Sequence, residues 1–526
     1  MSKGENLVRI VVLGLVLVMA LGLLAGARTA ENEFVMQVPN YLQKFDPQDN
    51  FQMAGFMLRG SYETLVTYKV QAGPLELEPC LAQSWEVVDN GGAYLFHLRP
   101  GVTFHDGAQL NAEAVKVSFD RAVELELAKL GIIEGVVESV EVVDELTVKV
   151  VLSNSLPSLL YRLTDFQIVS PLPVTNSDDW GKTWYLDNMA GTGPYMLDYR
   201  DPPSATALKR FDDYWGGWEG EHFDKVRFVT VTEPATAMQM LEAGDIDMLW
   251  SAPVEMLPQI KANPNLELVE SSAPSYVTIA MNTTKWPTSD IRIRRAISYA
   301  LDFETCIELI GGRPLADSIR GPLSESNPYY EDSLPWPEYN LEKARQLLTE
   351  AGNPNGEGLP TLELIWSRSW DYQAKTVQVL KEGLAQIGIT LEIYPLNFAS
   401  MLAKNKDAET GAHMSFIISY PTEDAIPDQL MSNMMRSGGR YNWSWFSSTP
   451  QGGIVDYLID EARFTLEEED REVLYKQLQQ IAVNNYLALW PFKLTELDAI
   501  RADVKGYVMV PGYEKLVPFY HMWKER

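Results

Sequence analysis

The sequence predicts a mixed α/β protein of more than one domain, and three observations support this prediction. With 526 residues the chain is too long to fold around one hydrophobic core, so two or three domains are expected. Its 46% hydrophobic and 22% charged residues are typical of a globular protein rather than a disordered one. Strand and helix patterns also alternate: a strand at 362–366, a helix at about 372–387 and a strand at 388–393 predict a right-handed crossover unit.

Residues 84–107, SWEVVDNGGAYLFHLRPGVTFHDG, predict a β-hairpin followed by further turns. An apolar run at 85–88 precedes residues 89–92, Asp-Asn-Gly-Gly, which tolerate the positive φ of a tight connection. Apolar and other side chains alternate over 94–98, as in a strand with one face in a core. Composition alone would allow such a hairpin in any globular protein.

The remaining elements follow from periodicity and from helix-capping residues. In the first half, we expect a strand at 34–38, a helix from Ala112 to about Leu130 capped by Asn111, and a strand at 146–150. In the second half, helix starts are marked by Pro234, Asp290 and Asn340, Gly244 ends the first of these helices, a strand covers 276–282, and the last helix covers about 468–485.

The glycine-rich string Gly191-Thr192-Gly193-Pro194-Tyr195 was tested against two phosphate-binding patterns. The dinucleotide pattern needs a glycine where Met196 stands, and the Walker pattern that would end at Gly181-Lys182-Thr183 needs one where Asn176 stands. Neither nucleotide-binding motif is therefore predicted.

Several of these strings, in order along the chain, resemble one protein family. Residues 84–107 depart little from the pattern SWxxxxDGxxYxFxLRxGVxFxDG. The other matching strings are YETL at 62–65, GTGPY at 191–195, FDDYW at 211–215, GDID at 244–247 and IRIRRAISYALD at 291–302. Together they resemble the family 5 extracellular solute-binding proteins, the peptide-, nickel- and oligosaccharide-binding components of ABC importers. The resemblance runs from about residue 34 to 510.

The resemblance implies a periplasmic-binding-protein-like α/β fold, with two lobes, a hinge and an extra inserted domain (the three-domain cluster-C type). Ligand is then expected in the cleft between the lobes. The expected division is a signal peptide at 1–30, a discontinuous domain I, an inserted domain II at 66–189 and a domain III, the second lobe, at 284–488. Domain I is expected at 31–65, 190–283 and 489–526. The hairpin at 84–107 is expected at the edge of domain II, without ligand contact.

Charge and cysteine content restrict the classes of partner. The formal charge is −29, and removal of residues 1–30, which hold Lys3, Arg9, Arg28 and Glu5, would leave −31. So acidic a chain is not expected to bind a nucleic-acid backbone. Cys80 and Cys306 are the two cysteines. We expect two small buried side chains, with a disulfide as the alternative.

The amino terminus has the pattern of an export signal. Lys3 and Arg9 precede an apolar run over residues 10–27, which ends in small residues. Ala27 stands where a lipobox requires cysteine, so lipid attachment there is excluded. A periplasmic protein is expected, and an uncleaved anchor is the alternative.

The sequence contains no recognisable catalytic or metal motif. The five histidines do not form HExxH or another metal-ligand spacing, and there is no GxSxG string. We therefore expect no enzyme, no cofactor and no metal site. A secreted glycan hydrolase, which needs only two carboxylates, is the alternative from another class, and a binding protein that serves chemotaxis is a further one.

The resemblance implies three segments that project into the cleft. In the first, Arg368 is expected to meet a ligand carboxylate and Trp370 to stack on the ligand. In the second, Phe416, Ser419 and Tyr420 are expected at the ligand. Peptide binders typically carry an aspartate where Ser419 stands, and it pairs with the peptide amino group. Glu423, Asp424 or Asp428 could substitute for it.

The third segment is aromatic and contributes Asn442, Trp443 and Trp445, which we expect to form a strand with the two tryptophans on one face. The expected function is thus a monomeric, non-catalytic receptor for a peptide or peptide-like solute. It would work with the permease and ATPase subunits of an ABC transporter in the inner membrane. An oligosaccharide or other neutral solute is the alternative ligand, because Ser419 carries no charge. A nickel ligand is less expected, because only His413 lies near the predicted cleft.

Overall fold

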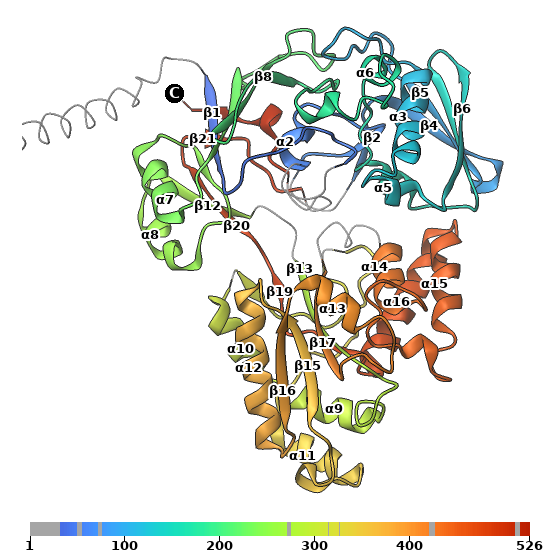
Figure 1. Ribbon diagram of the computed structural model, residues 1–526, viewed down its shortest axis with the longest axis vertical. Coiled ribbons are helices and arrows are strands. Elements are labelled where there is room, and N and C mark those ends of the chain that lie inside the picture. Colours follow the sequence, from blue (N-terminus) through green and yellow to red (C-terminus); the bar gives the residue numbers. More distant parts are fainter. Residues whose placement is uncertain are drawn as a thin grey trace, which may run out of the picture.

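The computed structural model of the chain has two lobes, one above the other in Figure 1. It describes residues 32–49, 55–71, 76–270, 275–313, 315–325, 327–419, 427–510 and 516–525, and for Phe56, Ile418 and Ser419 the backbone alone. The expected signal peptide at 1–30 lies outside the described residues. In the described part of the chain, none of the helices is both long and apolar enough to cross a bilayer.

The first lobe is built on a mixed seven-stranded sheet. Its strand order is β12-β20-β11-β1-β10-β9-β8, with bounds Leu266–Glu270, Leu497–Arg501, Met248–Leu249, Glu33–Val38, Lys225–Thr230, Ala205–Arg210 and Tyr195–Asp201. Strand β1 is parallel to β10 and β11. Alternate residues of β1 pack into two different cores, since Phe34 and Met36 belong to one and Val35 to the other.

Helices and short strands complete this lobe. The helices are α2 (Gly55–Arg59), α7 (Pro234–Ala243) and α8 (Leu257–Ala262), and β21 (Val504–Lys505) pairs with β22 (Trp523–Lys524). As predicted, α7 begins at Pro234 and ends at Gly244, whose φ of 79° suits a residue without a side chain.

The inserted domain carries a four-stranded antiparallel sheet with the order β4-β5-β7-β6. The bounds are Ala82–Val88, Ala93–Leu98, Thr147–Leu152 and Val137–Asp144. The predicted hairpin is confirmed: β4 pairs with β5 antiparallel, β4 is an edge strand, and residues 89–91 have positive φ. The other elements are α3 (Ala112–Glu124), α4 (Leu130–Ile133), α5 (Leu159–Leu163), α6 (Pro171–Thr175) and the strand pair β2 (Val66–Tyr68) and β3 (Leu77–Pro79).

The second lobe has its own sheet, in the order β14-β19-β13-β17-β15-β16, with β18 also paired to β13. The bounds are Ala316–Asp317, Lys493–Leu494, Ser275–Met281, Met414–Ser419, Leu362–Ser367, Leu391–Leu396 and, for β18, Ala488–Leu489. The helices are α9 (Ile291–Tyr299), α10 (Phe303–Ile310), α11 (Leu341–Glu350), α12 (Asp371–Gln386), α13 (Phe398–Lys404), α14 (Pro427–Met435), α15 (Val455–Phe464) and α16 (Glu468–Asn484).

Two segments run between the two large sheets. One leads from β12 to β13, and the other from β19 to β20, which is visible as the red strand between the lobes in Figure 1. The expected lobe boundaries at 283/284 and 488/489 therefore need correction, because residues 275–281 and 488–494 contribute strands to the second sheet. The mainly apolar residues 276–281 and 487–492 would suit either core, so the sequence did not locate the crossing.

Both cysteines are buried and free, in accord with the prediction that they are small core side chains. Burial raises the pKa of both thiols, which disfavours the reactive thiolate.

Candidate ligand site between the lobes

The first lobe presents the carboxyl ends of four strands along one edge of its sheet. Strands β1, β10 and β11 are parallel, and β12 runs the same way because both β11 and β12 are antiparallel to β20. Strand β12 leads to the second lobe at its carboxyl end, so this edge is the one that faces the second lobe. Ligands of open α/β sheets bind at the carboxyl ends of parallel strands.

The second lobe presents the corresponding edge of its own sheet. Strands β15, β16 and β17 are parallel, so their last residues, Ser367, Leu396 and Ser419, lie at the same edge. Strand β13 is antiparallel to β17 and enters from the first lobe beside Ser419, where Tyr276 is its register partner. The carboxyl edges of the two sheets therefore face each other, on either side of the crossing segments.

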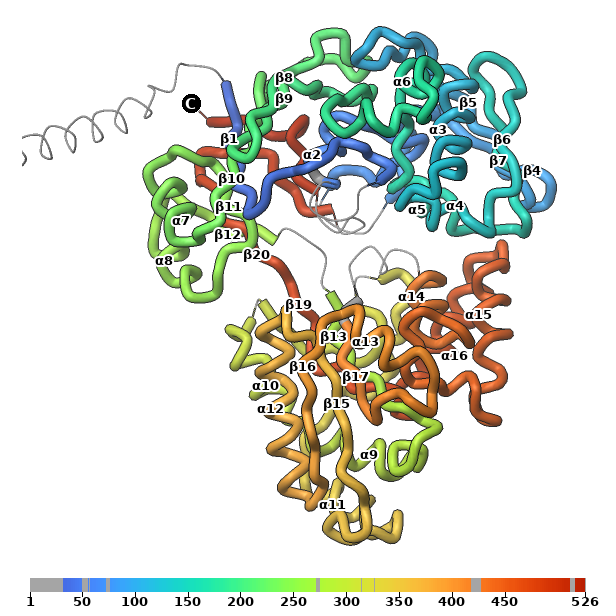
Figure 2. Tube along the Cα trace, viewed as in Figure 1, coloured from blue at the N-terminus to red at the C-terminus, as the bar shows by residue number. Residues whose placement is uncertain are grey.

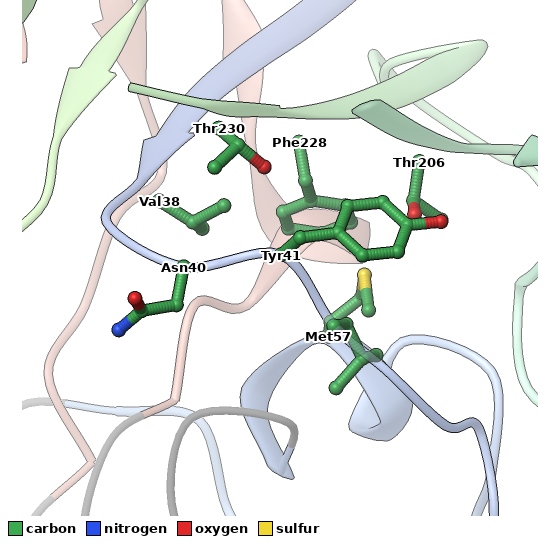
Figure 3. Close-up of a pocket in the computed structure, with 8 residues that line it drawn as sticks. Val38, Asn40, Tyr41, Met57, Thr206, Phe228 and Thr230 are labelled. Carbon is green, nitrogen blue, oxygen red and sulfur yellow. The ribbon is translucent and has the colours of Figure 1, made fainter. Parts of the chain in front are cut away.

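A cavity of about 70 Å³ lies at the first of these edges, beside the ends of β1 and β10. Figure 3 shows the side chains of Tyr41, Met57 and Phe228 converging on this space. Its other lining residues are Val38, Asn40, Leu42, Thr206 and Thr230. The lining is predominantly apolar, and such a space suits a branched aliphatic or similar small apolar group.

Two of the residues that line the cavity carry hydroxyl groups that a ligand could hydrogen-bond. The hydroxyls of Thr206 and Thr230 are buried, and neither has a hydrogen-bond partner within the described residues. An unpaired buried hydroxyl costs about 1–3 kcal/mol, which a ligand atom or water that bonds to it would recover. Tyr41 is held in place, since its hydroxyl accepts a hydrogen bond of 2.7 Å from Nε of Arg200.

The first predicted segment lies at the second edge. Trp370 precedes α12 directly, is partly buried, and its ring lies 5.6 Å from that of Tyr372. Arg368 has an exposed side chain, and its backbone N–H donates to the carbonyl of Leu396 over 2.9 Å. The structure thus brings both residues to the carboxyl ends of β15 and β16.

The second predicted segment requires a correction. Phe416 is only 1% exposed and packs in the core of the second lobe, so it offers a ligand no surface. Ser419 ends β17 at the edge that faces the first lobe, although its side chain is not described, and Tyr420 lies outside the described residues.

The third predicted segment forms a turn rather than a strand, because Trp445 has a positive φ of 49°. Trp443 is 3% exposed and packs beneath β13 and β15. Asn442 is also buried: its Nδ2 donates to the carbonyls of Met435 and Arg436, and its Oδ1 accepts from Ser444. These two side chains hold the loop and do not serve as ligand contacts. Trp445 is partly buried in the same cluster.

Two further candidate residues, His413 and Asp428, already bond to other groups of the protein. His413 is buried, its Nδ1 accepts from the Glu363 N–H, and its Nε2 lies 3.1 Å from the carbonyl of Trp286. This geometry fits a neutral ring without a nitrogen to spare for a metal. Asp428 is ion-paired with Arg162 of the inserted domain, whereas Glu423 and Asp424 lie outside the described residues.

The first-lobe residues of the candidate site were not predicted from the sequence. Asn40 and Tyr41 directly follow β1, and their position after the first parallel strand is the signal that could have indicated them. Thr206 and Phe228 come from paired strands whose register is visible only in the folded sheet.

The chain was compared with known proteins. It is 28% identical over 480 residues to heme-binding protein A of Haemophilus influenzae, which covers 86% of this chain and 85% of that protein. It is 27% identical over 496 residues to the glutathione-binding protein GsiB of Pectobacterium atrosepticum, which covers 92% of each. These relatives are named as binding proteins.

A solved structure, that of HbpA2 from Haemophilus parasuis, superposes with a TM-score of 0.82 at 22% identity, over 94% of this chain and 100% of that one. This likeness confirms the two-lobed solute-binding fold expected from the sequence. The model of the bacterial extracellular solute-binding proteins, family 5, matches residues 76–443. The chain therefore belongs to the family 5 extracellular solute-binding proteins, the substrate-binding components of ABC importers.

Proposed function

We propose that this protein captures a peptide or peptide-like solute between its two lobes, without catalysis, and presents it to the permease and ATPase subunits of an ABC importer. The observation that carries the proposal is the pair of carboxyl edges that face each other across the crossing segments. A ligand held by both edges stabilises the closed arrangement by its differential affinity for that arrangement.

The side chains at the two edges support a peptide-like ligand. The cavity beside β1 offers an apolar space with two unpaired hydroxyls, which suits a ligand side chain next to polar backbone groups. On the other edge, Trp370 offers a ring for stacking and Arg368 a cation for a carboxylate. Glutathione, the named ligand of the relative GsiB, combines carboxylates with amide groups.

A neutral solute such as an oligosaccharide is the second candidate, and one observation favours it. The carboxylate of Asp428 accepts from Arg162 and Ser158, so it is not available to a ligand amino group. Ser419, at the end of β17, supplies no charge. A ligand without an amino terminus would not need a carboxylate there.

The proposal includes export to the periplasm by the signal at residues 1–30, with Ala27 in place of a lipid-bearing cysteine. Mass spectrometry of the exported protein tests this part. A mass that retains the apolar segment would contradict a soluble periplasmic form.

A thermal-shift panel of glutathione, short peptides and oligosaccharides tests the ligand class, because a bound ligand raises the unfolding temperature by mass action. We expect a shift with glutathione or a peptide, loss of that shift in Trp370→Ala, and its retention in Trp336→Ala, a half-exposed tryptophan of the same lobe. A shift with oligosaccharides alone would overturn the peptide class. An unchanged affinity of Trp370→Ala would remove Trp370 from the site, and turnover of a labelled peptide or glycan would overturn the non-catalytic assignment.

A further inference from the structure

The two lobes also meet at a second place, where the inserted domain reaches the second lobe. Asp428, in the first turn of α14, is 1% exposed and accepts from Nη2 of Arg162 at 2.8 Å and from the hydroxyl of Ser158 at 3.1 Å. Ser158 and Arg162 lie at α5 of the inserted domain, whereas α14 belongs to the second lobe. In Figure 2 the segment of α14, α15 and α16 lies directly below α4 and α5.

A second arginine approaches the same carboxylate from within the second lobe. Nε of Arg463, at the end of α15, lies 3.8 Å from Oδ2 of Asp428, the oxygen that also receives Arg162. Burial and the positive charge of Arg162 lower the pKa of Arg463. Asp428 is therefore the anion that lets two guanidinium groups approach each other when the lobes are together.

An apolar contact flanks the ion pair. The side chain of Leu466 lies against Gly91 in the turn of the hairpin, where a Cβ on Gly91 would lie only 2.9 Å from Leu466 Cδ2. Phe464 packs against the core of the inserted domain. The hairpin at 84–107 thus touches the second lobe, a role that its sequence did not predict.

This contact depends on the relative position of the lobes. The chain passes from one large sheet to the other between β12 and β13 and between β19 and β20, and the contact residues belong to none of these strands. When the lobes separate, Arg162 and Asp428 become hydrated individually. The contact is also incompletely satisfied, since Oδ1 of Asp428 and Nε of Arg162 are buried without hydrogen-bond partners among the described residues. When the contact opens, water can bond to these two atoms. This hydration lowers the free-energy cost of breaking the contact, so the contact can form and break reversibly.

We propose that Asp428, Arg162 and Leu466 form an interlobe latch that sets ligand affinity without contacting the ligand. The apparent affinity of a binding protein scales with the fraction of molecules in the binding-competent closed form, so a contact made only in that form raises it. The inference rests on the proposed capture of a solute between the lobes. Eight residues, 420–427, separate Asp428 from Ser419 at the end of β17, so the latch lies close in sequence to the proposed ligand edge.

The test measures the lobes directly in full-length protein without ligand, so its result does not depend on which solute binds. Spin labels at Val123→Cys on α3 and Val473→Cys on α16, which are 56% and 64% exposed, report the distance between the inserted domain and the second lobe by pulsed electron resonance. The native cysteines are buried and are left in place.

We expect short and long distances in the parent, and a fall in the closed-to-open ratio on the order of tenfold in Arg162→Met. Asp428→Asn in the Arg162→Met background should change the ratio little further, because the two residues act through each other. Lys116→Met, which removes a cation from a surface pair within the inserted domain, serves as the matched control and should leave the ratio unchanged.

Identical distance distributions in the parent and in Arg162→Met would overturn the latch, and so would independent, additive effects of the two substitutions. Unfolding temperatures of all variants, measured in parallel, show that each folds. A failed thermal shift with peptides would contradict the ligand class and leave the latch intact, so the two proposals fail separately.

Discussion

The inserted domain has two neighbours, and it contacts them in different ways. Towards domain I the backbones touch: Lys129 and Ile168 donate through their N–H groups to the carbonyls of Gln48 and Glu63, at 2.9 Å each. Towards the second lobe, the residues that the structure describes form one ion pair, Arg162 with Asp428, beside the contact of Leu466. The first contact joins the domain to the first lobe as one body, and the second can form and break.

The two contacts of the inserted domain also differ in how completely their buried arginines are hydrogen-bonded. On the side of domain I, Arg121 is fully buried, pairs with Asp46 at 2.6 Å, and also donates to Gln48 and to the carbonyl of Trp180. All three of its nitrogens thus have a partner, whereas Nε of Arg162 has none among the described residues. A fully satisfied buried network suits a permanent junction, and an incomplete one suits a contact that must open.

The largest expected effect is a difference in the free energy of unfolding between two variants. The same substitution is made at two arginines, one at each contact of the inserted domain. Arg121→Met should lower the free energy of unfolding by about 3–5 kcal/mol, because it leaves the carboxylate of Asp46 buried without its guanidinium partner. Arg162→Met should cost less than about 1 kcal/mol, because the lobes can part and Asp428 can be hydrated. Urea unfolding of the two variants measures both values. Equal losses would show that the two interfaces are alike.

A somewhat smaller effect is expected at the glycine string 191–195. A Cβ on Gly191 would overlap the carbonyl oxygen of Ser61, which belongs to the backbone and cannot turn away. Gly191→Ala should therefore destabilise the protein by about 2–3 kcal/mol. Gly131→Ala is the control, since a Cβ there meets no atom within 4 Å. Thermal unfolding compares them, and a neutral Gly191→Ala would refute the close approach as the reason for this glycine.

Local features of the fold were predictable because their causes lie within a few residues. Asn111 caps α3 as expected, with its Oδ1 accepting from the N–H of Ala114 at 2.9 Å, and Asp290 and Asn340 cap their helices in the same manner. The family resemblance supplied the arrangement of the lobes, which periodicity alone does not contain.

The candidate site and the latch were less predictable because their geometry depends on distant residues. Arg162 and Asp428 are separated by 266 positions, and neither has a local pattern that indicates the other. The expected strand at 442–445 failed for a related reason: Asn442 bonds to the backbone of Met435 and Arg436, and these bonds turn the chain. Trp370 lies near the carboxyl end of β15 because it follows that strand closely in sequence, whereas its expected contact with a ligand stays a prediction.

The smallest expected effect is a pH dependence of the permanent junction. Glu63 lies at this junction, where its carbonyl accepts from the N–H of Ile168 of the inserted domain at 2.9 Å. Its carboxylate accepts from Thr192, Trp215 and Tyr214 at 2.7, 2.8 and 2.9 Å. Desolvation outweighs these donors and raises the pKa of Glu63 from 4.5 to about 7. Because the folded protein holds the proton more tightly than the unfolded chain, this contribution is complete below pH 4.5 and is lost as pH rises through 7.

We therefore expect the stability of the parent, relative to Glu63→Gln, to fall by about 2 kcal/mol between pH 5.5 and pH 8. Urea unfolding at several pH values measures this difference, with Glu113→Gln, exposed on α3, as the control that should leave the profile unchanged. Parallel pH profiles for the parent and Glu63→Gln would mean that Glu63 titrates alike in the folded and unfolded protein. The three hydrogen bonds would then be sufficient to keep the carboxylate ionised. The junction, like the latch, would then contain a buried charged carboxylate rather than a neutral buried carboxyl group.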